Sequence, residues 1–504
     1  MTVEKIPLVA ILAREMSDLS AHLATAVADG NLLAAARTNL EALLAGSAGD
    51  LAIRAVTELV ERGEWAELND RFFKTLAFGT GGLRGRTIGR VVTTAEQGNG
   101  GPNGRPEHPC VGTATMNFYN VGRAVRGLIA HAKRNASGDR KPLLVFAHDT
   151  RHFSRDFAEF CAKVCTDLGC DAALFEGPRS TPELSFAVRE LRADAGVVLT
   201  ASHNPPHDNG FKAYGNDGAQ LVEPDASAVI AEVNAIASER YDALPEAERG
   251  KLIVLGADLD ARYQARLKTL LLQPQLLQGA STKVVYTNLH GTGGHIVVPM
   301  LRGFGFEVLT VPEQDVQDGR FPTVESPNPE NAPALKMAID LAEKEGAEIV
   351  IGTDPDCDRM GVAVRDSAGK MQLLTGNQIG SLMAWYRTKT CFDLGWLNDT
   401  TRNRALLVKT FVTTELQTAI AHGFGIGIVN TLTGFKYIAG KLRKYEQAIP
   451  ASKLEGDYRS LSEAETRALR LEYSRFFVFG GEESYGYLGS DSVRDKDGNG
   501  AAVM

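Results

Sequence analysis

Three aspartates at alternate positions, Asp354, Asp356 and Asp358, follow an apolar run at residues 347–352 that predicts a buried strand. Carboxylates this close together repel one another unless a cation gathers them. Hard oxygen ligands are typical of Mg²⁺ sites. An EF-hand is excluded, because Arg359 and Arg365 stand where that loop needs glycine and glutamate. The motif predicts a Mg²⁺ site, and the alternative is a solvated acidic turn.

A serine and a histidine occupy the loop Thr200-Ala201-Ser202-His203-Asn204-Pro205, directly after another predicted strand. The G-x-S-x-G motif of serine hydrolases is absent. The following Asn209-Gly210 is typical of a tight turn, which would present Lys212 back toward the serine. A hydroxyl beside a lysine and a histidine suits a phosphoryl acceptor or donor. The alternative is a simple turn closed by prolines.

Two further loops combine glycine with polar side chains. The first, residues 480–486 (GGEESYG), offers Glu482, Glu483 and Ser484, which could hydrogen-bond sugar hydroxyls. The second, residues 78–85 (FGTGGLRG), offers Arg84 to a phosphate. A polar β-turn and an ordinary glycine-rich loop are the respective alternatives. In open α/β sheets ligands bind beyond the carboxyl ends of strands, where such loops lie.

The elements that must position these loops form an alternating pattern. Residues up to about 75 have apolar residues at helical spacing, whereas short apolar runs then alternate with helical patterns. The alternation restarts twice, after a polar helical stretch at 224–272 and again near 375. It predicts the α/β class: three consecutive mixed-sheet α/β domains preceded by a helical N-terminal extension. The predicted boundaries are 1–75 for the extension and 76–255, 256–374 and 375–504 for the domains.

The composition excludes several classes of protein. A chain of 504 residues with 44% apolar and 23% charged residues is neither disordered nor fibrous. Its net charge of −8 gives no reason to expect nucleic acid or membrane as a partner. No apolar stretch is long enough to span a bilayer. Six scattered cysteines predict buried free thiols and a reducing cytoplasm.

Taken in order, these motifs resemble the α-D-phosphohexomutase superfamily, and within it the phosphoglucomutases and phosphopentomutases that carry a helical N-terminal extension. The resemblance runs from about Phe78 to the last residue. The matching segments are FGTGGLRG, TASHNP with NGFKAY, DGRFPTVESPNPE, GTDPDCDR, TLTGFKYI, and GGEESYG with VRDKDG.

The resemblance implies a role for each matching residue. Ser202 would be the catalytic phosphoserine and, with Asp354, Asp356 and Asp358, a ligand of Mg²⁺. The transferred phosphoryl group would be contacted by His203, Lys212, Arg359 and Arg84. The sugar would be oriented or contacted by Thr433, Gly434, Glu482, Ser484 and Lys496.

The resemblance also implies a reaction and its partners. The phosphoserine would give its phosphoryl group to a phosphosugar, forming a bisphosphate such as glucose 1,6-bisphosphate, which reorients and returns the other phosphoryl group. The expected partner is a small phosphosugar, hexose or pentose, with no nucleic acid and no membrane, and the expected state is a monomer. The family carries a fourth domain with a phosphate-gripping loop that is absent from this sequence, which predicts impaired turnover.

Two other functions remain open from the sequence. Asp354-Pro355-Asp356 imitates the nucleophile of aspartyl-phosphate phosphatases, although Asp358 stands where threonine or valine belongs. A catalytically inactive phosphosugar-binding protein would keep the same binding loops. The position of a covalent phosphate, on Ser202 or on Asp354, distinguishes the mutase from the phosphatase. Phosphosugar binding without turnover would distinguish the binding protein from the mutase.

Overall fold

The computed structural model describes residues 8–504, apart from residues 80, 137, 139 and 280 and the side chains of 8–17. Four helices come first in this part of the chain. The first seven residues of the predicted extension and Thr80 of its neighbouring glycine-rich loop lie outside the described residues. The helices share a core of leucine, valine and phenylalanine side chains that also receives Val111 and Tyr119 from the next unit. They are α1 (Leu8–Ala28), α2 (Ala34–Gly46), α3 (Leu51–Glu61) and α4 (Trp65–Phe72).

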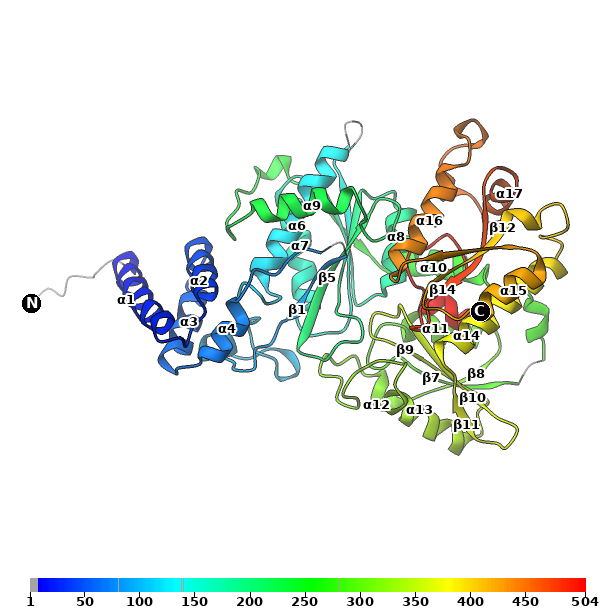
Figure 1. Cartoon of the computed structure of the whole chain (residues 1–504), viewed down its shortest axis with the longest axis horizontal. Helices are drawn as coiled ribbons and strands as arrows, with labels where there is room; N and C mark the ends of the chain where they lie inside the picture. The colour runs from blue at the N-terminus through cyan, green and yellow to red at the C-terminus, as the bar shows by residue number, and fades with distance from the viewer. Residues whose placement is uncertain (1–7, 80, 137, 139, 280) are drawn as a thin grey trace, which may run out of the picture.

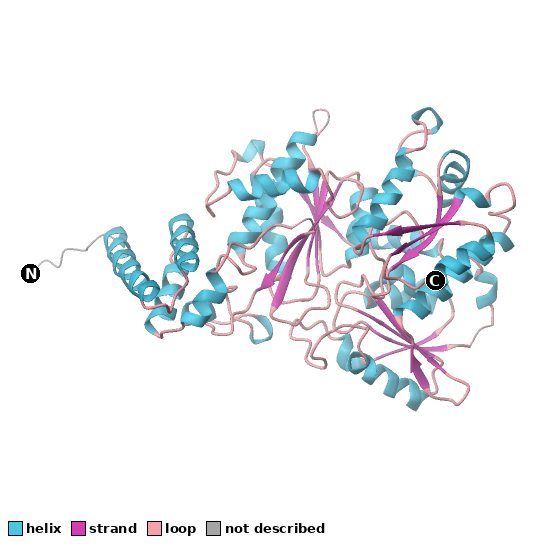
Figure 2. Cartoon of the chain, in the orientation of Figure 1, coloured by secondary structure: helices cyan, strands magenta, loops and turns pink. Residues whose placement is uncertain are grey.

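The first α/β unit is a six-stranded sheet in the order β1-β5-β4-β2-β3-β6. Strands β2, β3, β4 and β6 run parallel, whereas β5 runs antiparallel to both of its neighbours, β4 and β1. Alternate residues of β2 enter two different cores, so helices cover both faces (Figure 2). Its elements are β1 (Gly82–Arg86), α5 (Thr94–Gln97), α6 (Phe118–Asn135), β2 (Leu143–His148), α7 (Ser154–Asp167), β3 (Asp171–Phe175), α8 (Thr181–Glu190), β4 (Ala195–Leu199), β5 (Asp208–Gly215), α9 (Asp225–Ala235) and β6 (Leu252–Leu255).

The second unit is a five-stranded sheet in the order β11-β10-β9-β7-β8, and the third is a four-stranded sheet in the order β13-β12-β14-β15. The second contains α10 (Ala257–Lys268), β7 (Lys283–Thr287), α11 (Gly294–Gly303), β8 (Glu307–Thr310), α12 (Pro312–Asp315), α13 (Ala332–Glu345), β9 (Ile349–Thr353), β10 (Met360–Arg365) and β11 (Met371–Leu373). The third contains α14 (Gly376–Asp393), β12 (Ala405–Thr410), α15 (Leu416–Phe424), β13 (Gly427–Thr431), α16 (Phe435–Gln447), α17 (Glu463–Tyr473), β14 (Phe476–Gly481), β15 (Tyr487–Leu488) and α18 (Gly498–Val503).

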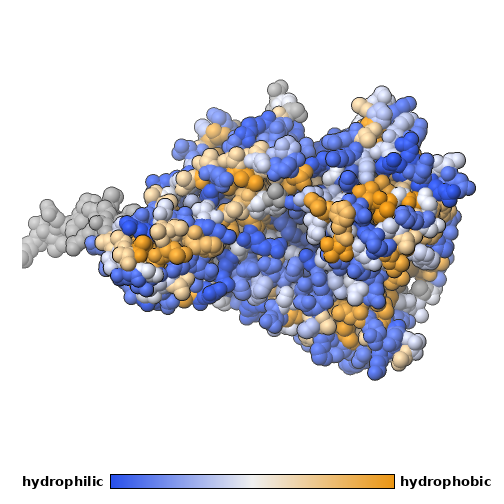
Figure 3. All heavy atoms as spheres, viewed as in Figure 1, coloured by the Kyte–Doolittle hydropathy of each residue, from blue (hydrophilic) through white to orange (hydrophobic). Residues whose placement is uncertain are grey.

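These three sheets confirm the predicted fold class. Figure 1 shows the extension at one end of the molecule, the first unit in the middle, and the other two units side by side at the far end. The surface in view is mostly hydrophilic, with separate apolar patches over the extension and the C-terminal units (Figure 3). Within the described part of the chain, no helix is both long and apolar enough to cross a membrane. The six cysteines are free and buried, as predicted.

Three local predictions were wrong. The stretch 224–272 is not helical throughout, because the apolar run Leu252–Leu255 forms β6 at the edge of the first sheet. Residues 111–134 have the pattern of one continuous helix, but the helix begins only at Phe118, where the Asn117 side chain accepts a hydrogen bond from Asn120 N and caps it. Asn209 and Gly210 form no turn but lie within β5, paired with β1.

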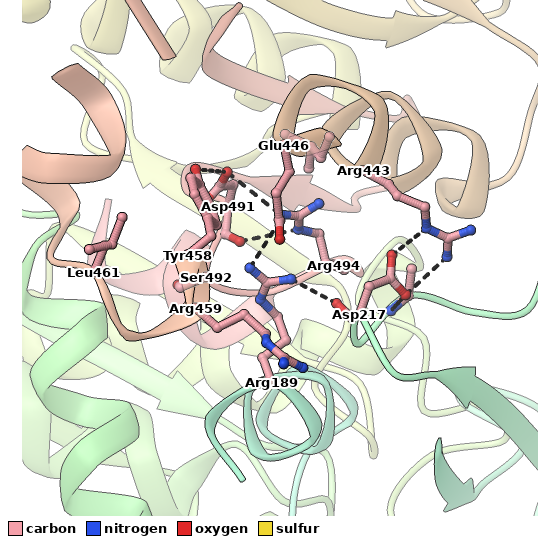
Figure 4. A network of polar contacts seen from close by, with 12 residues as sticks. Arg189, Asp217, Arg443, Glu446, Tyr458, Arg459, Leu461, Asp491, Ser492 and Arg494 are labelled. Atoms are coloured by element: carbon pink, nitrogen blue, oxygen red, sulfur yellow. Dashed lines mark hydrogen bonds and ion pairs between the residues drawn. The ribbon is translucent and has the colours of Figure 1, made fainter. Parts of the chain in front are cut away.

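Partly buried ion pairs join the first unit to the third. Arg443 on α16 donates to both carboxylate oxygens of Asp217, at 2.6 and 2.9 Å. Glu446, one turn further along α16, accepts from Arg189 of α8 at 3.3 Å and also pairs with Arg494 (Figure 4). Both arginines are buried, so water solvates their charges poorly, and Glu446 provides the negative counter-charge. The pairs therefore fix the third unit against α8 and the end of β5.

Candidate active site

Ser202 lies in the loop between β4 and β5, at the carboxyl end of β4. Its side chain is buried, and its Oγ donates a hydrogen bond of 2.7 Å to Asp354 Oδ2 of the second unit. Its φ of 53° is in the left-handed region, which a non-glycine residue rarely adopts. His203 Nδ1 lies 3.3 Å from the same Oγ. The loop thus directs one hydroxyl across the boundary between two units.

The acidic loop follows β9 and brings three buried carboxylates together. Asp354, Asp356 and Asp358 each offer an oxygen within 4.8 Å of the others. Asp354 Oδ1 accepts hydrogen bonds from the backbone N–H groups of Asp358 and Arg359, at 3.0 and 3.1 Å. The Oδ1 atoms of Asp356 and Asp358 are buried and find no hydrogen-bond donor among the described residues. Unsatisfied buried carboxylate oxygens of this kind fit a divalent cation.

Two lysines from different units balance part of this charge. Lys212 of β5 lies 2.6 Å from Asp356 Oδ2 and 3.0 Å from Asp358 Oδ2. Lys496, in the loop before α18, lies 3.2 Å from Asp358 Oδ2. The wrong turn prediction for Asn209-Gly210 nevertheless placed Lys212 correctly near the serine loop, because β5 runs back alongside β4.

The pKa values follow from burial and charge. Burial, followed by the neighbouring Asp356 and Asp358, raises the pKa of Asp354 well above its usual range. Burial also acts to raise the pKa of Asp358, but Lys212, Lys496 and Arg359 outweigh it and lower that pKa. For both lysines burial acts to lower the pKa, but the nearby carboxylates outweigh it and raise the pKa, so both stay protonated.

The pKa of His203 is lowered, whereas those of the two lysines are raised. Burial, followed by the charge of Arg359, lowers the pKa of His203 to about 4. Its imidazole is therefore neutral near pH 7 and can accept or donate one hydrogen bond at the serine hydroxyl.

Arg84 and Arg359 both lie on the lining of a cavity next to Ser202. Arg84 of β1 donates to Asn204 Oδ1 at 3.1 Å. Arg359 forms an ion pair with Glu330 and lies 3.8 Å from Asp358 Oδ1. This cavity of about 280 Å³ opens between them, large enough for a small ligand. Its lining consists of Gly81, Gly82, Leu83, Arg84, Thr200, Ser202, Lys212, Gln220, Asp358, Arg359 and Lys496.

Among the predicted sugar-contacting residues, Lys496 lies on the lining of this cavity, whereas Thr433, Gly434, Glu482 and Ser484 do not. Glu482, which is buried at the end of β14, accepts a hydrogen bond of 2.8 Å from Gly434 N. Burial raises the pKa of Glu482, and the charge of Lys496 offsets part of that rise. Thr433 is exposed and Ser484 is half-buried. The structure thus links Glu482 to Gly434 and Lys496 and leaves Thr433 and Ser484 more accessible.

Several polar residues around the site were not predicted from the sequence. Thr181 donates to Asp356 Oδ2 at 2.7 Å, and Glu330 pairs with Arg359. Asp149 and Arg151 follow β2 and contact the serine loop. The signal for the last two was available, because they follow a predicted strand at the same sheet edge as Ser202.

A buried serine, an acidic triad and paired lysines at the junction of three α/β units define the class of phosphosugar mutases. The sequence matches three family models described as phosphoglucomutase/phosphomannomutase, alpha/beta/alpha domains I, II and III, over residues 109–240, 261–369 and 375–504. The chain belongs to this family, within the α-D-phosphohexomutase superfamily.

Individual relatives agree with this assignment. A phosphoglucomutase of Staphylococcus epidermidis ATCC 12228 is 33% identical over 427 residues, covering 84% of this chain and 67% of the relative. A phosphoglucomutase of Staphylococcus aureus USA300 is 30% identical over 445 residues, covering 88% and 69%. The crystal structure of a Thermus thermophilus protein, provisionally named a phosphomannomutase, superposes with a TM-score of 0.62 at 26% identity, covering 85% and 78%.

Proposed function

We propose that this chain is a phosphosugar mutase that interconverts glucose 1-phosphate and glucose 6-phosphate through a phosphorylated Ser202. The observation that carries the proposal is the 2.7 Å hydrogen bond from Ser202 Oγ to Asp354, which joins residues 152 positions apart. The substrate follows from the relatives named phosphoglucomutase. A pentose phosphate is the second substrate class to test.

Ser202 would exchange a phosphoryl group with the substrate in both directions. In the first step the P–Oγ bond breaks while a P–O bond forms to a sugar hydroxyl, whose proton is transferred to Ser202 Oγ in net balance. The resulting glucose 1,6-bisphosphate reorients in the site, and its other phosphoryl group returns to Oγ by the reverse exchange. Phosphoryl transfer of this kind depends on positioning and charge neutralisation.

The charge balance supports Mg²⁺ as the cofactor. A phosphoserine beside three carboxylates carries about five negative charges, whereas Lys212, Lys496 and Arg359 supply three positive ones. The difference matches one divalent cation, which Asp354, Asp356, Asp358 and the phosphoserine would hold. When bound, Mg²⁺ would withdraw electron density from the phosphoryl group and offset its charge.

The proposal assigns a role to each of the remaining predicted residues. Lys212, Lys496, Arg84 and Arg359 present cationic groups to a phosphosugar in the cavity. His203 offers its neutral ring to Ser202 Oγ. Glu482 and Ser484, with Thr433 and Gly434, would contact sugar hydroxyls from the third unit. The predicted domain boundaries, the monomeric state, the cytoplasmic location and the impaired turnover remain predictions.

The decisive variant is Ser202→Ala. We expect the wild type, incubated with glucose 1,6-bisphosphate and Mg²⁺, to gain one phosphate on Ser202. With glucose 1-phosphate as the substrate, it should also form glucose 6-phosphate in a coupled assay. The variant should lose both signals because it has no acceptor oxygen. Intact-protein and peptide mass spectrometry locate the phosphate. Ser227→Ala, which removes an exposed hydroxyl on α9 away from the loop, is the matched control for the acceptor.

Two other outcomes would replace the proposal. A hydroxylamine-labile phosphate on Asp354 would indicate the phosphatase, although both oxygens of Asp354 already accept hydrogen bonds from Ser202 and two backbone N–H groups. Calorimetric binding of glucose 1-phosphate with neither phosphoserine nor turnover would indicate a binding protein.

A further inference from the structure

Arg151 holds the backbone of the serine loop from inside the first unit. The residue follows β2, and its side chain is fully buried. Its Nη2 donates to the carbonyl oxygens of Ser202 and Asn204, each at 2.5 Å. Its Nη1 donates to those of Pro205 and Asp208, at 2.8 and 3.3 Å. One guanidinium therefore gathers four carbonyl groups in and just beyond the serine loop.

The counter-ion of Arg151 holds the other side of the same serine. Asp149 Oδ2 lies 3.2 Å from Arg151 Nε and accepts a 2.6 Å hydrogen bond from Thr200 Oγ1. Thr200 Oγ1 in turn accepts a 2.8 Å hydrogen bond from Ser202 N. The backbone N–H and C=O of Ser202 are thus both tied to one buried ion pair.

The second unit closes this arrangement from outside. Phe321, within the segment 318–330, places its ring centroid 4.8 Å from Arg151 Cζ. Ser326 Oγ, in the same segment, donates to His203 O at 2.9 Å. The segment DGRFPTVESPNPE, which has no role in the proposed chemistry apart from Glu330, therefore packs on the serine loop and on the arginine that holds it.

The backbone of Ser202 needs such support. A serine at a φ of 53° relaxes toward more common backbone angles unless its surroundings prevent it. A planar guanidinium can direct several N–H groups at once, whereas a lysine ammonium offers one compact charge. Relaxation of the loop would move Ser202 Oγ away from Asp354, and misplacement by about 1 Å can cost about 100-fold in rate.

We propose that Arg151 is the positioning residue of the phosphoryl-accepting serine, with Phe321 as its cap from the second unit. Arg151 acts through the backbone of Ser202 and touches neither sugar nor phosphate. It therefore governs the rate of phosphoryl exchange at Oγ and leaves sugar binding unchanged. The inference rests on the proposed function.

The test compares Arg151→Lys with the wild type and with Arg155→Lys. Arg155 lies on α7 and is half-exposed, so its replacement is a matched control outside the loop. We expect Arg151→Lys to lower kcat about 100-fold, with KM for glucose 1-phosphate within about 3-fold. Phosphorylation of Ser202 by glucose 1,6-bisphosphate, followed by mass spectrometry, should slow by the same factor. Arg155→Lys should match the wild type in all three measurements.

A second variant keeps the test valid if Arg151→Lys does not fold. Phe321→Leu removes the ring above the guanidinium and keeps an apolar side chain, and we expect it to lower kcat about 3- to 10-fold with unchanged KM. Equal kcat in the folded Arg151→Lys protein, or equal loss in kcat and affinity, would overturn the positioning role. If the wild type itself forms no phosphoserine, the proposed function fails instead, so the two failures are distinguishable.

Discussion

A neutral, buried histidine at the end of β2 makes the stability of the first unit depend on pH. His148 Nδ1 lies 2.8 Å from Asp149 O, and its Nε2 has no hydrogen-bond partner among the described residues. Burial lowers the pKa of His148 from 6.5 to about 4. Between these values the unfolded chain binds a proton that the folded chain excludes. The contribution to stability is therefore complete above about pH 6.5 and is lost as the pH falls toward 4.

We expect this one group to lower the free energy of unfolding by about 2 kcal/mol between about pH 7 and pH 5. His148→Gln keeps an N–H donor but cannot titrate, so its urea midpoint should change less with pH than that of the wild type. His131→Gln, at a half-buried position on α6, is the control and should leave most of the pH dependence in place. Equal pH dependence in wild type and His148→Gln would contradict the assignment.

The same neighbourhood shows which residues can be predicted from a sequence. Ser202, Asp354 and Lys212 were predicted because chemically capable side chains follow apolar runs and match a family pattern. Arg151 and Asp149 were not, although they follow β2 in the same way. An arginine near an aspartate on a loop is typical of an exposed ion pair, and only the fold shows that this pair is buried under Phe321.

Among the elements, α16 places the carboxylate of Glu446 between two buried arginines. Glu446 pairs with Arg189 and Arg494, whose side chains are 5% and 0% exposed, and Arg494 Nη1 already lacks a hydrogen-bond partner within the described chain. Replacing the carboxylate would leave two buried guanidinium groups beside each other, with Asp491, 3.6 Å from Arg494, as a neighbouring carboxylate. We expect Glu446→Gln to lower the free energy of unfolding by about 2 kcal/mol, a reduced figure because Glu446 is partly exposed.

Urea unfolding followed by tryptophan fluorescence measures this loss. Asp340→Asn removes half of an exposed ion pair with Lys336 on α13 and is the matched control, with an expected change within about 0.5 kcal/mol. Limited proteolysis should also cut Glu446→Gln faster than the wild type, because the third unit would be held less firmly against the first. A Glu446→Gln protein as stable as Asp340→Asn would show that the pairs add nothing to the joint.

At this scale the sequence predicted types of element better than their ends. Apolar periodicity indicated the strands that carry Ser202 and the aspartates. It missed β6, since a four-residue edge strand between two helices resembles an apolar patch on one long helix. It also extended α6 back to Val111, because a loop whose residues are buried carries apolar side chains at helical spacing as well.

Across the whole molecule, the acidic loop and the serine belong to different units, so a bound cation would tie those units together. We expect Mg²⁺ to raise the unfolding temperature of the phosphorylated protein, with a stabilisation of about 2.7 kcal/mol at about 100 times its dissociation constant. Asp358→Asn should abolish the shift, because the Oδ1 of Asp358 finds no hydrogen-bond donor among the described residues and is left to bind the cation.

Thermal unfolding with Mg²⁺ and with a chelator measures the effect. Glu343→Gln, at an exposed position on α13, is the control and should retain the full shift. A shift of equal size in Asp358→Asn would place the cation elsewhere. An acidic loop able to hold a cation was predictable from the spacing of three aspartates, but its contact with Ser202 required the arrangement of the three sheets.

The separation of Ser202 from Asp354 along the chain also has a consequence during synthesis. A ribosome adds about 5 to 20 residues per second, so the acidic loop emerges on the order of ten seconds after the serine loop. Throughout that interval the serine hydroxyl lacks its carboxylate partner, and for most of it Phe321 has not been synthesised either. A phosphate on Ser202 would therefore report that the second unit has been made and has docked, and it would mark mature chains apart from nascent ones.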